Sequence, residues 1–412
     1  MAKKTLIKML DLFAGCGGLT DGFLHTEKFE EIAAVEWKEP QIRTLRNRLS
    51  KKWGIKDVES TILLQDIQKE EELFNGTLGS NGLDAIIEGK RGIDVIIGGP
   101  PCQAYSIAGR VRDKNGMKDD YRNFLFEHYL SVVKRYTPDV FIFENVPGLL
   151  SARPTGIPVV EIISSRFSDI GYEIFSTLKH AVVNAADYGV PQVRKRIIIL
   201  GVRKESFKNV NIQDALNDFY QNILPSFKSL HKISVREAIG DLPKCEPFFD
   251  QTHHKKRISH STPASTVTWH RPRYHNLRDM DTFTILAEDI ESGRREYDSE
   301  KIAQLYETKV GSKSPIHRYH VLDGDLPSTT IIAHLYKDGN RFIHYDSSQS
   351  RSITPREAAR LQSFSDDFDF IGSQGNVYEM IGNAVPPKLA NCIAKALIVF
   401  LKKYLPGKYA HL

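Results

Sequence analysis

Short apolar runs alternate with longer amphipathic stretches over residues 5–205, and this alternation constrains the fold more than any other feature. Helical spacing of apolar residues is found at 39–53, 121–136 and 158–169. Strands that alternate with helices form parallel sheets with helices on both faces. We therefore predict an α/β fold with a doubly wound, mostly parallel, Rossmann-like sheet. The apolar runs with the length and composition of buried strands are 6–13, 31–37, 94–99, 139–146, 172–180 and 196–202.

The character of the chain changes at about residue 206. From 206 to 345 the sequence is polar and rich in histidine, without a clear period, which is typical of a separate, smaller and irregular domain. Helical signals return after residue 350, where Thr354 and Pro355 are suited to an N-cap and a first helical position. We predict a discontinuous first domain, formed by 1–205 and 376–412, and a second domain with a hinge at 206–375.

Composition places the chain among globular proteins of a reducing compartment. Of its 412 residues 41% are hydrophobic, and no apolar run is long enough to span a membrane. The four cysteines are dispersed and form no CxxC pair. We therefore predict no metal site and a cytoplasmic location. The formal net charge of +5 favours a polyanionic partner only weakly.

Positive charge is concentrated in one window of the second predicted domain. Residues 251–280 contain six Lys or Arg residues against one acid, together with Trp269 and Tyr274. Basic residues mixed with aromatics are typical of nucleic-acid surfaces. A solvated basic face has the same composition, so the window favours a nucleic-acid partner without deciding it.

The run GGPPCQ (98–103) places a cysteine directly after a predicted strand. Pro100 and Pro101 restrict the backbone, and Cys102 follows on a stiffened loop at the carboxyl end of that strand. Ligands bind at this edge of open α/β sheets. Most free cysteines are small buried hydrophobes, but this position suits a nucleophile.

Three other predicted strands end in residues suited to an adenosine-containing ligand. The glycines of DLFAGCGGL (11–19) let the backbone approach a ligand closely. Glu36 is placed to bind ribose hydroxyls, and Trp37 can stack on adenine. Asp66 can accept a hydrogen bond from an exocyclic amine. A solvated strand end and a core aromatic are the alternative interpretations of Glu36 and Trp37.

Charged residues mark two further strands. Glu144 directly follows the apolar run DVFIF, where a carboxyl group can donate a proton to a substrate. Arg194 and Arg196 are two residues apart, which puts them on one side of a strand and suits recognition of an anion or a carbonyl. An edge carboxylate and a basic strand edge are the alternatives. Together, these residues predict that Cys102 attacks a carbon of a substrate ring, which Glu144 and the two arginines polarise. They also predict that an adenosyl cofactor lies across the glycine turn.

These residues, in this order, resemble the cytosine-5 DNA methyltransferase family of bacterial restriction-modification systems. The resemblance covers most of the chain outside the middle segment. One departure is Ser365, where the family usually has proline, and it affects only a local loop. The six motifs that carry the resemblance are DLFAGCGGL (11–19), GGPPCQAYSIAGR (98–110), ENVPGLL (144–150), QVRKRIIILGVR (192–203), RSITPREAARLQSF (351–364) and YEMIGNAVPPKLANCIAKAL (378–397).

The resemblance implies methyl transfer from S-adenosylmethionine to carbon 5 of a cytosine within a specific double-stranded DNA sequence. The cytosine would be flipped out of the duplex, the Cys102 thiolate would add to ring carbon 6, and Glu144 would hydrogen-bond or protonate ring nitrogen 3. Arg194 and Arg196 would hold the cytosine carbonyl and the surroundings of Cys102. The cofactor-binding residues would be Phe13, Ala14, Gly15, Gly17, Gly18, Leu19, Glu36, Trp37, Asp66, Pro100 and Asn383.

The resemblance also implies where DNA binds. Residues 103–123 are similar to a loop that closes over flipped DNA, and 206–345 corresponds in position to the target-recognition region. Within the basic window we expect phosphate contacts and two guanine-reading candidates, Arg271 and Arg273. The expected DNA-contacting residues are Gln103, Ser106, Arg110, Lys255, Lys256, Arg257, Arg271 and Arg273. The expected partners are duplex DNA and a cognate restriction endonuclease. We expect the protein to be a monomer that is associated with the nucleoid in a prokaryotic or viral host.

Three other functions fit parts of the sequence. A tRNA cytosine-5 methyltransferase has the same motifs but usually a shorter middle segment. A regulatory binding protein without catalysis would not need the intact set of Cys102, Glu144, Arg194 and Arg196. A nucleotide-binding oxidoreductase has no use for the run PPCQ. The sequence does not identify the DNA word that is read, because base contacts depend on side-chain geometry.

Overall fold

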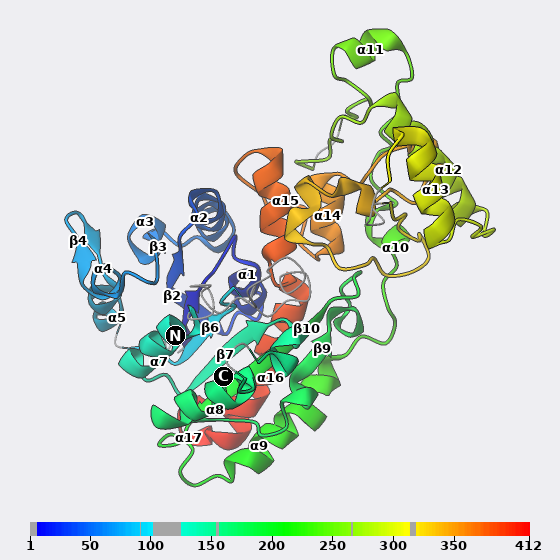
Figure 1. The fold of residues 1–412 in the computed structure, drawn as a ribbon. Helices are drawn as coiled ribbons and strands as arrows, with labels where there is room; N and C mark the ends of the chain where they lie inside the picture. Colours follow the sequence, from blue (N-terminus) through cyan, green and yellow to red (C-terminus); the bar gives the residue numbers. More distant parts are fainter. Residues whose placement is uncertain (1–5, 91, 102–124, 154–155, 265–266, 314–318) are drawn as a thin grey trace. The chain divides into compact units, whose positions relative to one another are not determined.

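A computed structural model gives the fold of residues 6–90, 92–101, 125–153, 156–264, 267–313 and 319–412. The chain divides into two compact units (Figure 1). Both chain ends belong to the first unit, which the second unit interrupts. The first unit is Met1–Tyr188, Lys195–Leu230 and Val385–Leu412, and the second is Gly189–Arg194 and His231–Ala384.

An eight-stranded sheet forms the centre of the first unit, in the order β3-β2-β1-β6-β7-β10-β8, with β9 paired to β10. β1, β2, β3, β6 and β7 are parallel, whereas β10 is antiparallel to β7, β8 and β9. The strand order changes direction at β1, so the switch point lies between β1 and β6. The strands are β1 Ile7–Leu12, β2 Phe29–Glu36, β3 Ile62–Leu64, β6 Val95–Gly98, β7 Val140–Asn145, β8 Tyr172–Ile174, β9 Val182–Asn184 and β10 Lys195–Arg203; a separate hairpin contains β4 Gly76–Thr77 and β5 Ser80–Asn81.

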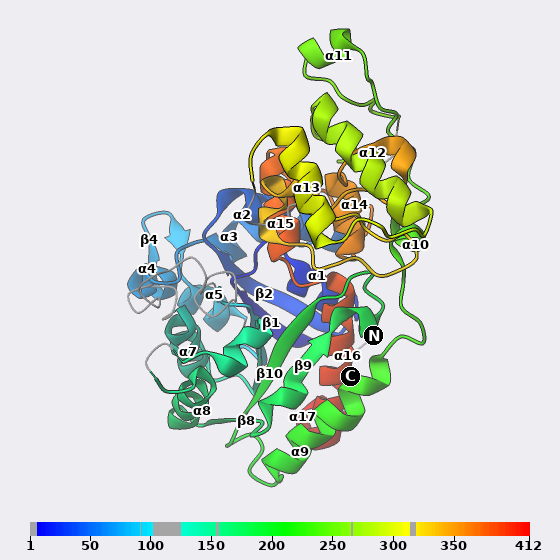
Figure 2. The same ribbon diagram turned by 45° about the vertical axis from the view of Figure 1, so that its right-hand side comes forward.

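Helices cover both faces of this sheet, and both ribbon views place α7 and α8 on the face opposite to α16 (Figures 1 and 2). This arrangement confirms the predicted doubly wound α/β fold. The helices of the first unit are α1 Gly18–Leu24, α2 Glu39–Trp53, α3 Val58–Thr61, α4 Glu70–Asn75, α5 Leu83–Gly89, α7 Leu125–Tyr136, α8 Val159–Asp169, α9 Ile212–Asp218, α16 Pro387–Tyr404 and α17 Pro406–Tyr409.

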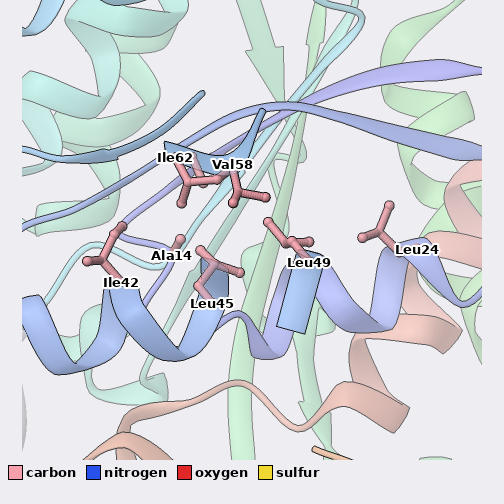
Figure 3. Close-up of a cluster of buried hydrophobic side chains, with 8 residues drawn as sticks. Ala14, Leu24, Ile42, Leu45, Leu49, Val58 and Ile62 are labelled. Carbon is pink, nitrogen blue, oxygen red and sulfur yellow. The ribbon is translucent and has the colours of Figure 1, made fainter. Parts of the chain in front are cut away.

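A cluster of aliphatic side chains joins α2 to the ends of the first three strands (Figure 3). Ile42, Leu45 and Leu49 recur at helical spacing along α2, so they share the face that is buried. Burial of each such side chain stabilises the fold by about 1.5–3 kcal/mol. The other members of the cluster are Ala14, Leu24, Ala34, Val58 and Ile62.

The C-terminal helix α16 packs on α1, the helix that follows β1. A Cβ atom on Gly22 would lie 2.4 Å from the Cβ of Ala390, so this close approach requires glycine. Asn391 of α16 also donates a hydrogen bond to the Gly22 carbonyl (3.0 Å). By length and composition, Gln374–Tyr404 could cross a membrane, but most of this stretch is buried inside the protein, as core helices are.

The second unit consists of helices and loops connected by isolated β-bridges. Its buried centre includes the ion pair of Arg351 and Glu357, whose side chains are each 1% exposed (2.7 Å). Phe283 and Leu286 of α12 pack against Tyr319 in a second aromatic and aliphatic cluster. The helices are α10 Val235–Ile239, α11 Gln251–Lys255, α12 Leu277–Glu291, α13 Ser299–Val310, α14 Pro355–Leu361 and α15 Gln374–Asn383.

The sequence predicted an irregular second domain, and the long helices α12 and α13 correct that description. Asn276 and Asp298 cap them by accepting hydrogen bonds from main-chain N–H groups of the first turns. No residue of α13 is fully buried, but Ile302, Leu305 and Tyr306 recur at helical spacing and pack against the Phe283 cluster, so this short apolar pattern was present in the sequence and was not recognised.

The unit boundaries also differ from those expected at 205 and 376. Residues 206–230 belong to the first unit, because Phe219 packs edge-on against Phe400 of α16 (ring centroids 5.6 Å apart). Residues 376–384 belong to the second unit, because Gly382 of α15 lies against the main chain of Ile332. The first unit therefore resumes at Val385.

Two carboxyl groups are buried where β1 and β2 run side by side. Asp11 of β1 is fully buried and accepts a hydrogen bond from the Thr20 hydroxyl (2.6 Å). Burial raises the pKa of Asp11 to about 7. Glu31 of β2 is 7% exposed, and in the described part of the chain neither of its carboxylate oxygens has a hydrogen-bond partner. Burial, assisted by the charge of Asp11, raises the pKa of Glu31 well above its ordinary value.

We expect the substitution Glu31→Gln to stabilise the protein more at about pH 8 than at about pH 5. The folded state binds the Glu31 proton more tightly than the unfolded chain does, so the free energy of unfolding falls as the pH rises above the ordinary pKa of 4.5 toward the folded value. The neutral amide removes this loss. Urea unfolding at both pH values measures it, with Glu30→Gln at the exposed neighbouring position as the control. A stability gain that does not change with pH would contradict the prediction.

Candidate active site

The loop after β1 is a tight turn of left-handed residues at the switch point of the sheet. Phe13, Gly15 and Gly17 have φ values of 59°, 57° and 94°. A Cβ atom on Gly17 would lie 2.5 Å from Cδ1 of Leu45 and would also be strained at this φ, so only glycine fits here. Within the described residues, a Cβ atom on Gly15 would meet no heavy atom within 4 Å. The remaining predicted members of this loop, Ala14, Gly18 and Leu19, are buried.

Glu36 ends β2 and holds this turn in place. One carboxylate oxygen accepts the Gly15 N–H (2.9 Å), and the other accepts the N–H groups of Trp37 (3.0 Å) and Lys38 (2.9 Å). Glu36 is 8% exposed, and burial raises its pKa against the lowering effect of these hydrogen bonds. The Trp37 side chain next to it is 55% exposed, so its ring has a face available for stacking.

Asp66 follows β3, the next strand along the same edge. Its carboxylate accepts the N–H of Gln68 (3.0 Å), which forms an Asx turn. The Gln65 N–H donates to the Glu36 carbonyl (2.9 Å), so the chain leading into Asp66 is attached to the end of β2. The structure thus places the carboxylates of Glu36 and Asp66 at the ends of two paired strands.

The turn after β6 is held against the end of β7. The Asn145 side-chain amide donates to the Pro100 carbonyl (3.3 Å). A Cβ atom on Gly99 would lie 2.7 Å from Oε2 of Glu144, so glycine is needed for this approach. Asn145 belongs to the run ENVPGLL (144–150), and no role was predicted for it. An amide next to a strand-end glutamate is the signal that could have pointed to it.

Glu144 and Arg196 form an ion pair at this edge, with Arg196 Nε 2.8 Å from Glu144 Oε1. The register pairs Glu144 with Ile198, so Arg196 lies two residues away on the same face of the sheet. The two side chains are 12% and 14% exposed. Burial lowers the pKa of Arg196 from its ordinary value, and Glu144 opposes that shift. The carboxylate is therefore oriented by a guanidinium beside the turn that leads to Cys102.

Arg194 does not share this arrangement, which corrects the expectation of an arginine pair. β10 begins at Lys195, so Arg194 precedes the strand and belongs to the second unit. Its guanidinium donates to the carbonyls of Ile331 (2.9 Å), Gly382 (3.1 Å) and Ala384 (3.1 Å). Arg194 is 2% exposed. These bonds fix the Arg194 side chain at the end of α15, and its expected contact with a substrate carbonyl stays a prediction.

Several predicted residues have no described geometry. Cys102, Gln103, Ser106 and Arg110 lie outside the described residues, so their roles rest on the motifs alone. Pro100 is described and buried. Asn383 is exposed at the C-terminal end of α15 in the second unit, whereas the other cofactor candidates belong to the first.

The predicted DNA-contacting residues of the second unit divide into two groups. Lys255, Lys256 and Arg257 are exposed at the end of α11, and Arg271 is exposed with its guanidinium over the Trp269 ring (5.5 Å). Arg273 instead donates to main-chain carbonyls, at Leu335 (2.7 Å) and Tyr336 (3.1 Å), and lies over the Tyr378 ring. Two of its N–H donors are thus used inside the unit, whereas Arg271 is exposed, and guanine reading by Arg273 stays a prediction.

Comparison with known proteins gives matches along nearly the whole chain. The family model for C-5 cytosine-specific DNA methylases matches residues 7–399. The chain is 31% identical to the Type II methyltransferase M.Bpa9945I of Bacillus paralicheniformis, over 94% of this chain and 98% of that one. It is also 31% identical to the Type II methyltransferase M1.HphI of Haemophilus parahaemolyticus, over 94% of this chain and 86% of that one.

Solved structures share the fold. A DNA modification methyltransferase encoded within an E. coli prophage aligns with a TM-score of 0.59 and 24% identity, over 96% of this chain and 99% of that one. The Dnmt2 methyltransferase of S. pombe aligns with a TM-score of 0.55 and 13% identity, over the same shares of the two chains.

We expect Arg196→Met to destabilise the protein by up to about 3–5 kcal/mol, because it leaves the Glu144 carboxylate without its partner in a mostly buried place. The double variant Arg196→Met/Glu144→Gln should be more stable than Arg196→Met alone, since the stranded charge is gone. Urea unfolding of both single variants and the double variant gives the coupling energy. Additive effects would show that the ion pair does not orient Glu144.

Proposed function

Since the chain belongs to the C-5 cytosine-specific DNA methylase family, it is a DNA (cytosine-5-)-methyltransferase, and we propose which of its residues perform the reaction. The observation that carries the proposal is the Glu144–Arg196 ion pair beside the Gly99–Pro101 turn. This turn leads directly into Cys102. A carboxyl group oriented next to a nucleophile loop is what addition to a cytosine ring requires.

The glycine turn fits S-adenosylmethionine, which supplies an electrophilic methyl group when bound. The open space at Gly15, the exposed ring of Trp37 and the strand-end carboxylates of Glu36 and Asp66 support this assignment. We assign ribose binding to Glu36, adenine stacking to Trp37 and recognition of an exocyclic amine to Asp66. Phe13 and the main chain of the glycine turn would contact the remaining part of the cofactor. Pro100 lies at the same edge of the sheet. Asn383 is assigned to cofactor binding because of its place in the motif YEMIGNAVPPKLANCIAKAL.

The chemistry on the cytosine follows from the residues of β6, β7 and β10. The Cys102 thiolate forms a bond to ring carbon 6, while the carboxyl group of Glu144 gives a hydrogen bond or proton to ring nitrogen 3. Arg196 orients Glu144 and is assigned to the ring carbonyl. Carbon 5 becomes nucleophilic and would take the methyl group that the bound cofactor supplies, with the cofactor's sulfur leaving as a thioether. Water then takes the proton from carbon 5, the electron pair of that bond re-forms the ring double bond and expels the Cys102 thiolate, and ring nitrogen 3 returns its proton to Glu144.

Recognition of the DNA word is assigned to the second unit. Arg271 is the stronger candidate for reading guanine, because its guanidinium is exposed and stacked on Trp269. Trp269 is itself held in place: its indole N–H donates to the Phe370 carbonyl (3.0 Å) and its own carbonyl accepts the Arg356 N–H (3.2 Å). A preoriented arginine loses less conformational freedom when it binds a base.

The relatives named Type II methyltransferases suggest a place in a restriction-modification system. The partners would then be double-stranded DNA, flipped at the target base, and a restriction endonuclease of the same specificity. We propose that the protein acts as a monomer in the bacterial cytoplasm, with the loop containing Gln103, Ser106 and Arg110 closing on the DNA.

We expect the purified protein to transfer tritiated methyl groups to duplex DNA and not to tRNA. Cys102→Ser should lose turnover by several orders of magnitude, because a hydroxyl ionises far less than a thiol, and should still bind DNA. Duplexes with 5-fluorocytosine at the target should trap the native protein covalently, since fluorine does not leave as a proton does. Bisulfite sequencing of the modified DNA identifies the word. An active serine variant or labelled tRNA would refute the assignment.

We expect Glu36→Ala to weaken binding of S-adenosylmethionine by about 1–3 kcal/mol, the usual cost of losing a buried hydrogen-bonding partner. The substitution removes the acceptor of three main-chain N–H groups and loosens the turn. Titration calorimetry measures the affinity. Glu39→Ala, at an exposed glutamate of α2, is the matched control and should bind like the native protein. Equal affinities for the two variants would contradict the placement of the cofactor.

We expect neutralisation of Lys255, Lys256 and Arg257 together to weaken binding to every DNA sequence and to reduce the salt slope by up to about three units, one for each lost phosphate contact. Arg271→Ala should instead relax the preferred word and leave the slope nearly unchanged. Binding curves at several salt concentrations, on specific and scrambled duplexes, measure both effects. Neutralisation of the exposed Lys56, Lys208 and Lys402 of the first unit, which removes the same three charges, controls for total charge. A triple variant with native binding at every salt concentration would remove this window from the DNA surface.

A further inference from the structure

Residues 246–261 form an arm on the second unit. Pro247 and His260 are bridged in antiparallel fashion, and the Phe248 N–H donates to the Ser259 carbonyl (2.9 Å). Helix α11 closes the tip of the arm, and both ribbon views show α11 projecting away from α12, α13 and α14 (Figures 1 and 2). The chain therefore leaves the body of the unit and returns to it through a paired stem.

Two large apolar side chains are exposed on this arm. Phe249 is 57% exposed and Ile258 is 43% exposed. Phe249 and Ile258 each lie two residues beyond the bridge of Pro247 and His260, one on either side of α11. Both exposed side chains are therefore near the tip of the arm. An exposed apolar pair on a projecting element is typical of a binding surface.

Three consecutive cations follow the helix at the tip. Lys255, Lys256 and Arg257 are all exposed, and in the part of the chain that the structure describes none of them forms an ion pair. The nearby Asp250 caps α11 by accepting the His253 N–H (3.0 Å) and also contacts the His253 ring. The arm therefore carries three adjacent cations against the two carboxylates of Glu246 and Asp250, next to its exposed apolar side chains.

The tip is held by internal contacts. His254 is buried, with Nε2 2.7 Å from the Phe248 carbonyl and Nδ1 3.3 Å from the Tyr274 hydroxyl. The guanidinium of Arg257 lies over the Tyr274 ring, 5.6 Å from its centroid. These contacts fix the tip on the stem before any partner binds, which lowers the entropic cost of binding.

We propose that this arm is a wedge that bends the DNA substrate. Phe249 and Ile258 press against a base step outside the target base, and the three cations contact the adjacent phosphates. Apolar side chains flanked by Lys or Arg unstack base steps and kink duplex DNA in this way. A protein partner would bury the apolar pair without needing three adjacent cations, since charged residues are depleted at the centres of protein interfaces. The inference rests on the proposed function, because it takes duplex DNA as the partner.

The test compares native protein with Phe249→Ala/Ile258→Ala on a duplex of about 30 base pairs that contains the methylated word. Fluorophores at the two ends report bending by energy transfer, and 2-aminopurine, moved along the flanks of the target, reports unstacking. The native protein should bend the duplex and brighten 2-aminopurine at one flanking step. The double variant should lose that flanking signal and most of the bend, and should bind about tenfold more weakly, as loss of one stacked ring does.

Three comparisons make the result specific. Leu78→Ala, at a fully exposed leucine of the β4–β5 turn, should behave like the native protein. Phe249→Trp/Ile258→Leu should keep the bend, since both large apolar groups remain. The salt slope of the Ala/Ala variant should equal that of the native protein, because no phosphate contact is lost.

The outcomes separate this inference from the proposed function. If the native protein methylates the duplex while the Ala/Ala variant, folded with an unchanged melting temperature, bends and unstacks it equally, the wedge is refuted and the patch serves another partner, such as a protein. If the native protein transfers no methyl group to DNA, it is the proposed function that fails.

Discussion

The carboxylate of Glu36 joins the end of β1 to the end of β2, and the cofactor side of the sheet depends on this contact. A buried carboxylate is costly unless its oxygens accept hydrogen bonds, and here three main-chain N–H groups supply them. The Gly15 N–H can reach Glu36 only because the chain turns sharply through left-handed residues after Leu12. The turn, its glycines and the open space beside Gly15 are consequences of one polar group that has to be satisfied. A ribose that binds Glu36 would donate hydrogen bonds to carboxylate lone pairs that the main-chain N–H groups of the turn do not use.

The four arginines assigned to substrate or DNA differ in the groups that their guanidiniums contact. Arg194 and Arg273 donate to main-chain carbonyls inside the second unit, where a planar group with five donors can join loops that lack regular secondary structure. Arg196 is used by a carboxylate at the edge of the sheet. Arg271 lies exposed on an aromatic ring. Only the last arrangement leaves the donors facing solvent, which is the requirement for reading a base edge.

Chemistry and DNA contact are assigned to elements of different stiffness. The groups proposed to react lie at the ends of central strands, whose positions are fixed by ladder hydrogen bonds and by the buried aromatic and aliphatic side chains around them. The groups proposed to contact DNA lie on a helix tip and on loops of the second unit, which are fixed by single side chains such as His254 and Trp269. Rigid strand ends suit a reaction that tolerates little displacement. Projecting elements suit a duplex whose sequence and curvature have to be read.

Local patterns in the chain were enough to predict the class of the fold and the edge of the sheet to which the chemistry is assigned. The apolar runs predicted the main strands, and apolar spacing predicted helices at 39–53 and 158–169, because burial of strands and of one helix face leaves a local pattern in the chain. The sequence analysis also placed Glu36 and Glu144 at strand ends. It did not separate the surroundings of Arg194 from those of Arg196, it did not show the main-chain partners of Arg273, and it missed α13. Only the tertiary structure decided the arginine contacts, because the partners of Arg194 and Arg273 lie 137 and 62 residues along the chain at Ile331 and Leu335, and a hydrogen bond across such a distance leaves no periodic signal in the sequence.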